Sequence, residues 1–301
     1  MRAPATRQDD RGGLLLALAG FALLSFGDAV VKSMAGDWAP TAIATLRYTI
    51  GAAGLSALVL AREGTAAFAL PKPGLQAVRG AAVAIATVAF FSSLLVMPLA
   101  EATTIIFVSP MITALLAPYF LGERSRAAAW IASAAAFVGV LIVLRPNLAE
   151  LGPAALLPLA SACAMSALFI ANRAVAGQAS AVAMQAVLAI MALPLLFAAT
   201  AAGHFSGIEA LGLSVPPVSV IAKCAVVAVS ASTAHWLIYL GTTRAGAASV
   251  APMTYVQLVV AGGFGWVWFG DRPDFVTLVG AAVIIGAGLF LWRASKSGID
   301  G

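Results

Sequence analysis

The chain has 301 residues, of which 62% are hydrophobic and only 10% are charged, and its formal net charge is +5. Soluble domains carry roughly 25% charged residues, so this composition excludes an ordinary water-soluble domain. The charges gather in short clusters between long apolar runs. These runs reach roughly 20 residues, the length that a helix needs to cross about 30 Å of hydrocarbon. We therefore predict an all-α polytopic membrane protein.

Ten apolar runs follow one another along the chain, and we predict one transmembrane helix for each. The expected spans are residues 13–35, 39–61, 75–98, 102–121, 127–145, 153–173, 180–202, 218–240, 246–269 and 274–293. Gly, Pro and charged residues separate the spans, as expected where helices end. The first run is too long for a signal-peptide core, so we expect it to be retained as a span.

Lys and Arg divide unevenly between the two sets of connecting segments. The set that includes both termini carries Arg2, Arg7, Arg11, Arg62, Lys72, Arg79, Arg124, Arg126, Arg173, Arg244, Arg293 and Lys296. The other set carries Lys32, Arg145, Lys223 and Arg272. Because cytoplasmic loops are enriched in basic residues, both termini are predicted in the cytoplasm. The basic loops fit contact with anionic lipid rather than with nucleic acid.

One short phrase occurs twice, as "YFLGERSR" from Tyr119 to Arg126 and as "VWFGDRPD" from Val267 to Asp274. Aligning the two phrases places Gly122-Glu123-Arg124 on Gly270-Asp271-Arg272 and Arg145 on Arg293, and a slightly different offset places Lys32 on Arg173. Each phrase closes the fourth span of a set of five. Because five is odd, the second set must enter the membrane from the opposite side. We expect the phrase itself to be a structural turn, with Gly at a helix C-cap.

The sequence thus predicts two inverted five-helix repeats, an arrangement found in many secondary transporters. The first repeat is expected at residues 13–146 and the second at residues 153–293. Cytoplasmic tails are expected at residues 1–12 and 294–301.

The segment from Ala102 to Pro146 resembles the fourth and fifth helices of the EamA family, in the drug/metabolite transporter (DMT) superfamily. "FGDAVVK" and "LRYTIGA" resemble the first two helices of that family. The resemblance, which extends to the bacterial exporters of aromatic and other amino acids, implies a ten-helix basket with both termini inside. It also implies a central cavity lined mainly by the first, third, fourth, sixth, eighth and ninth helices. Members move amino acids, nucleotide-linked metabolites, riboflavin, S-adenosylmethionine or drugs.

We therefore expect a secondary transporter of small organic metabolites, with amino-acid export as the favoured task. Uptake of riboflavin, S-adenosylmethionine or another nucleotide-like metabolite fits the same sequence, and a membrane-embedded enzyme or a passive channel are further alternatives. The sequence contains no Walker A, His-Glu-x-x-His or Gly-x-Ser-x-Gly pattern, so we predict neither an enzyme nor a metal site nor a cofactor. The expected partners are a small-molecule substrate and lipid, and the expected state is a monomer or weak homo-oligomer.

Ionisable residues inside the spans are the sharpest candidates for function, because a charge in the middle of a membrane costs at least about 2.5–3.5 kcal/mol. Asp28 and Arg47 are expected at similar depths in the first two spans, and Lys32 lies one helical turn beyond Asp28. One interpretation is a structural Asp28–Arg47 ion pair, with Lys32 reaching the surface. The other is that Asp28 or Lys32 faces the cavity and binds a zwitterion or takes part in proton coupling. A pair that breaks in one state would act as a gate.

Aromatic and polar residues of other spans are the remaining candidates for a cavity wall, a composition typical of small-molecule sites. They are Phe90, Phe91, Thr104, Phe107, His235, Trp236, Tyr239, Tyr255 and Gln257. Pro110 and Pro252 lie in the fourth and ninth spans, and we expect them to be hinges or fixed kinks, because a helix-interior Pro removes a backbone hydrogen bond.

Overall fold

The computed structural model of the chain describes residues 7–69, 72–121, 127–175, 178–245 and 251–297. Its α-helices are α1 (Arg7–Lys32), α2 (Pro40–Arg62), α3 (Pro73–Ser93), α4 (Leu99–Ile106), α5 (Ser109–Leu121), α6 (Ala127–Leu151), α7 (Leu157–Ala174), α8 (Ala181–Phe205), α9 (Val218–Ala245), α11 (Val256–Phe269) and α12 (Phe275–Ser297). Four short 3-10 helices are η1 (Thr65–Phe68), η2 (Gly152–Leu156), η3 (Glu209–Leu211) and η4 (Ala251–Tyr255). The described part of the chain contains no β-strand.

Each of the ten predicted spans coincides with helical structure, which confirms the all-α polytopic membrane fold. Among the described residues, seven helices are long and apolar enough to cross a membrane. The remaining three spans hold shorter apolar helices, at Trp130–Val143, Met253–Phe269 and Phe275–Phe290.

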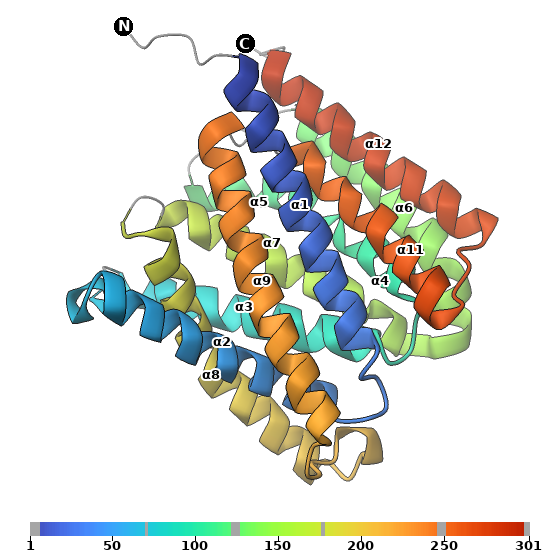
Figure 1. The fold of residues 1–301 in the computed structure, drawn as a ribbon. Helices are drawn as coiled ribbons and strands as arrows, with labels where there is room; N and C mark the ends of the chain where they lie inside the picture. The colour runs from blue at the N-terminus through green and yellow to red at the C-terminus, as the bar shows by residue number, and fades with distance from the viewer. Residues whose placement is uncertain (1–6, 70–71, 122–126, 176–177, 246–250, 298–301) are drawn as a thin grey trace, which may run out of the picture.

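The helices pack mainly in pairs that join the first half of the chain to the second. The most extensive pairings are α1 with α9, α6 with α12, α3 with α7, and α2 with α8. Figure 1 shows α1 and α9 running side by side at the front and α6 and α12 running together along one edge. The first turns of α1 and the last turns of α12 lie at the same end of the molecule (Figure 1).

Small residues allow the closest of these approaches. A Cβ atom added to Gly280 of α12 would lie 2.9 Å from the carbonyl oxygen of Gly139 on α6, so the two backbones nearly touch. In lipid no hydrophobic effect drives helices together, and such close van der Waals contact takes its place.

The fourth span is not one continuous helix. It begins at Leu99, earlier than predicted, and breaks after Ile106 into α4 and α5. At the break the N–H groups of Phe107 and Val108 bond to carbonyls only three residues back. Pro110 lies in the first turn of α5, where a missing N–H is tolerated, rather than in the interior of one continuous helix. Pro252 lies in η4, directly before α11. Both hinge candidates thus lie at interruptions, and their motion stays a prediction.

The fifth span is longer than predicted. We expected it to end near Arg145, but α6 continues to Leu151. The residues after Pro146 include good helix formers, and the helix gives way only before Gly152, whose φ of 60° is readily adopted by glycine.

Asp274 caps the N-terminus of α12, since its Oδ1 accepts a hydrogen bond of 2.7 Å from the N–H of Thr277. Hydrogen bonds from the Thr277 side chain and backbone lower the pKa of this carboxyl group below its usual value. A depressed folded-state pKa contributes stability above the unfolded pKa, and this stability is lost as pH falls through the folded pKa.

We therefore expect Asp274→Ala to lower the free energy of unfolding by about 1 kcal/mol at neutral pH. The difference from the parent chain should shrink below about pH 4, as the carboxyl group becomes protonated. Thermal unfolding in detergent across this pH range measures the difference in stability between the variant and the parent. Asp274→Asn keeps a capping oxygen but does not titrate, so it should stay close to the parent at neutral pH. An Asp274→Ala effect that is independent of pH would contradict the capping role.

Candidate functional site

Asp28 and Arg47 lie inside membrane-spanning helices, on α1 and α2, and both are half-buried. They do not form a salt bridge: among the described residues, the ion pair found is Lys32–Asp271. The structural Asp28–Arg47 ion pair that we expected is therefore not closed in this structure.

Arg47 is held by aromatic rings rather than by hydrogen bonds. Its guanidinium carbon lies 4.8 Å from the ring centroid of Tyr48 and 5.7 Å from that of Phe91, as in cation–π contacts. Helix α2, which carries Arg47, packs against α3, α8 and α9, and α9 packs along α1.

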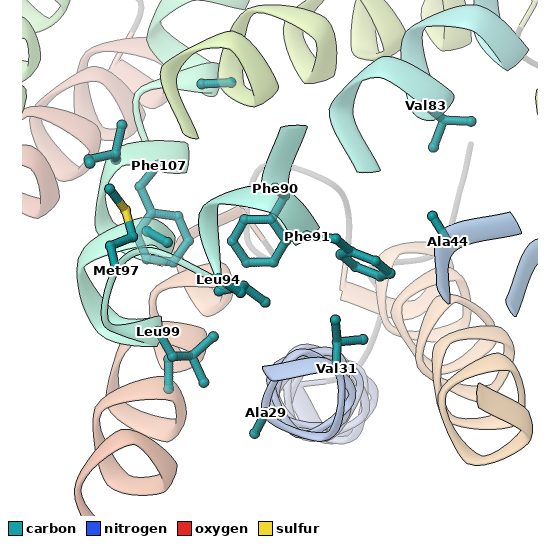
Figure 2. Packing of buried hydrophobic residues seen from close by; sticks show 14 of the residues in the cluster. Ala29, Val31, Ala44, Val83, Phe90, Phe91, Leu94, Met97, Leu99 and Phe107 are labelled. Carbon is teal, nitrogen blue, oxygen red and sulfur yellow. The ribbon is translucent and has the colours of Figure 1, made fainter. Parts of the chain in front are cut away.

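Phe90, Phe91, Thr104 and Phe107 are core residues in this structure rather than walls of an open space. Figure 2 shows the three rings within the cluster of buried hydrophobic side chains. Thr104 is 1% exposed, and its hydroxyl donates to the Ala100 carbonyl of its own helix. Their place in a cavity wall stays a prediction, and Phe91 also contacts Arg47.

Phe107 and Tyr255 meet where the two interrupted spans cross. Their rings pack edge to face with centroids 5.6 Å apart, from the end of α4 and from the residue that precedes α11. Gln257 follows in α11, where its side-chain amide nitrogen donates to the Thr254 hydroxyl and its backbone carbonyl accepts from the Ser25 hydroxyl of α1. The structure therefore brings Tyr255 and Gln257 to the junction between the two halves.

His235, Trp236 and Tyr239 of α9 are exposed. The place of these three residues in a cavity wall stays a prediction.

Lys32 does not extend freely to the surface, as one interpretation had it. Its Nζ lies 2.7 Å from Oδ2 of Asp271 and 3.1 Å from the carbonyl oxygen of Met97. The turn after α11 thus takes part in an ion pair, a role that sequence reasoning missed. Its counterpart in the first phrase, Glu123, lies outside the described residues.

Arg79 is a second functional candidate that the sequence did not reveal. We treated it as a loop charge, but it lies two turns inside α3 and is 2% exposed. Its Nε donates to Oδ1 of Asn172 on α7 at 2.6 Å, and its other nitrogens donate to Gln76 and to the Met184 carbonyl of α8. The rule that singled out Arg47, a charge within an apolar span, could have found it.

The described residues contain no group of three His, Cys, Asp or Glu that could hold a metal ion. Cys163 and Cys224 are free, and Cys224 is buried. The site consists instead of charges within membrane-spanning helices, which in membrane proteins mark substrate and ion pathways. Fold and site together define a polytopic membrane protein of the transporter class.

The chain belongs to the EamA-like transporter family, which matches it twice, at residues 11–145 and 152–293. A riboflavin transporter of Rhizobium johnstonii is 30% identical over 78% of this chain and 75% of its own length. An S-adenosylmethionine uptake transporter of Rickettsia bellii is 26% identical over 76% of each chain. The pseudopaline exporter CntI of Pseudomonas aeruginosa is 25% identical over 95% of this chain and 98% of its own.

A solved crystal structure has the same fold, with a TM-score of 0.63 and 23% identity over 94% of this chain and 98% of that one. The family and the relatives, which are all named as transporters, support a non-enzymatic membrane protein that transports small metabolites. They do not single out amino-acid export, since these relatives are named for other solutes.

Proposed function

We propose that this protein is a secondary transporter that moves small organic metabolites across the bacterial inner membrane by alternating access between two inverted repeats. In such an architecture, one half can open inward and its inverted twin can open outward by the same motion. Both termini would then be cytoplasmic, as the distribution of Lys and Arg predicts.

Two hydrogen bonds support the repeat at the level of single residues. Ser25 of α1 donates to the Gln257 carbonyl of α11 at 3.0 Å, and Ser166 of α7 donates to the Ser109 carbonyl of α5 at 2.9 Å. The offset that aligns Lys32 with Arg173 also aligns Ser25 with Ser166, and the offset that aligns Gly122 with Gly270 aligns Ser109 with Gln257. The second offset also aligns Phe107 with Tyr255, whose rings touch. Contacts related in this way are expected from a pseudo-two-fold axis.

The proposal for the substrate class rests on the charges of Asp28 and Arg47. Two opposite charges lie in neighbouring spans, and neither has a hydrogen bond or salt bridge within the described part of the chain. Unpaired charges in a membrane are costly. A solute with an ammonium and a carboxylate would satisfy both, with the carboxylate on Arg47 beside the rings of Tyr48 and Phe91. We therefore propose amino acids or amino-acid derivatives as substrates, with export as the favoured direction.

Counterflow in liposomes that contain the purified protein tests the function. Free amino acids and S-adenosylmethionine carry both an ammonium and a carboxylate, whereas riboflavin carries neither. We expect saturable exchange of labelled members of the first group. Riboflavin exchange without amino-acid exchange would keep the transporter and overturn the substrate class, and non-saturable flux without counterflow would indicate a channel.

Asp28→Asn should weaken exchange of the preferred zwitterion by about 10- to 100-fold, because a hydrogen bond to a charged group contributes about 1.5–3 kcal/mol. The apparent KM of counterflow is the measurement. Asp37→Asn is a matched control, since Asp37 is exposed in the segment after α1. A variant that keeps full exchange but loses only its response to a pH gradient would assign Asp28 to proton coupling instead.

A further inference from the structure

The ion pair between Lys32 and Asp271 joins segments that are far apart in the sequence. Lys32 is the last residue of α1, Met97 precedes α4, and Asp271 follows α11. The ammonium group of Lys32 contacts both other residues and also lies 5.2 Å from the ring centroid of Phe269. One cation therefore ties the first half of the chain to the second at one end of the bundle.

The backbone after α11 holds Asp271 in place. Gly270 has a φ of 72°, its N–H bonds to the Trp266 carbonyl, and the N–H of Asp271 bonds to the Gly265 carbonyl. The bond from Gly270 to Trp266 is that of an αL helix end, which requires the left-handed conformation that glycine adopts readily. In the phrase Gly270-Asp271 the glycine turns the chain, and the acid is thereby directed to Lys32.

The pair lies at the rim of the bundle. Its side chains are 12% and 25% exposed for Lys32 and Asp271, so water is near but does not surround them. At a distance of 2.7 Å the contact is a charge-assisted hydrogen bond, the strong kind. When such a pair separates into water, hydration compensates both charges, so it breaks and re-forms at low cost compared with a pair in the deep interior.

A second contact closes the same end. Nζ of Lys223, on α9, donates to the Ser33 carbonyl at 3.0 Å, directly after Lys32. Two lysine contacts thus hold the end of α1 to the second half of the chain, one to the turn after α11 and one to α9.

We propose that Lys32 and Asp271 form a latch that closes this mouth of the transport path and opens once in each cycle. The latch depends on the proposed transport function in one respect: solutes that pass between the two halves at this end must separate α1 from the turn after α11. The contacts of Lys32 with Met97 and Phe269 are then lost together with the ion pair.

Thiol labelling tests the latch without relying on transport. Cys224 of α9, which is buried directly after Lys223, is kept as the single thiol in a background with Cys163→Ser, and a membrane-impermeant maleimide is added from the Asp271 face. We expect slow labelling with the latch intact and about tenfold faster labelling in Lys32→Gln and in Asp271→Asn, which corresponds to about 1.4 kcal/mol. The exchanged pair, Lys32→Asp with Asp271→Lys, should label slowly again.

Asp37→Asn is the matched control, because it removes an exposed carboxylate near the same end of α1. Thermal unfolding of each variant establishes that it is folded. Lys32→Gln and Asp271→Asn each break the ion pair, so either variant alone tests the latch if the other does not fold. Unchanged labelling in the two single variants, or an exchanged pair that labels as fast as they do, would overturn the latch. Faster labelling without any solute exchange would keep the latch and reject the proposed function.

Discussion

Gly80→Leu is expected to prevent assembly of the helix bundle, and Gly80→Ala to lower its stability by about 1–3 kcal/mol, the usual cost of overpacking. Gly80 lies on α3, where a Cβ atom would be 2.5 Å from the carbonyl carbon of Met191 on α8. Because that neighbour is backbone, it cannot rotate away, and the two helices must separate. The melting temperature and the yield of monodisperse protein in detergent measure the effect.

Gly54→Ala is the matched control for this substitution. Gly54 lies in α2, and a Cβ atom there would meet nothing within 4 Å. Since Ala is favoured over Gly in a helix by roughly 0.5–1 kcal/mol, this variant should be as stable as the parent or more so. A similar loss of stability in Gly80→Ala and Gly54→Ala would show that close packing at Gly80 is not its cause.

The sequence predicts the helices well because their signal is local. Runs of apolar residues bounded by Gly, Pro and charged residues identify all ten spans. The predicted end of the fifth span is too early, because α6 continues past Pro146 to Leu151. The break before Ser109 was missed, because Pro110 predicts a disturbance in the fourth span but not whether the helix bends or divides.

The site was predictable only in part, because its contacts depend on how distant segments pack. Asp28 and Arg47 could be recognised, since a charge in an apolar span is conspicuous by itself. The partner of Lys32 lies more than two hundred residues away, and no local pattern connects Lys32 with Asp271. Thr104 and Phe107 were assigned to a cavity because hydroxyl and aromatic groups occur in cavity walls and cores alike.

Arg79 holds together the end of the bundle that lies opposite to the Lys32–Asp271 latch. It lies near the start of α3, whereas Met97, which contacts Lys32, follows the end of that helix. Asn172 and Met184 bring α7 and α8 to it, so one guanidinium joins both halves of the chain. The latch opposes two charges at the rim, while Arg79 is a cation buried among neutral acceptors.

Arg79→Ala is therefore expected to destabilise the protein by about 3 kcal/mol or more, because each acceptor left without a donor costs about 1–3 kcal/mol. Arg62→Ala, at the exposed end of α2, is the matched control and should change little. The decisive variant replaces the whole cluster with apolar side chains, Arg79→Met with Gln76→Leu and Asn172→Leu. This variant removes both side-chain acceptors together with the cation and leaves only the Met184 carbonyl without its donor, so the melting temperature in detergent should recover most of what Arg79→Ala loses. If the triple variant is no more stable than Arg79→Ala, the loss comes from packing of the long Arg79 side chain and not from its unpaired acceptors.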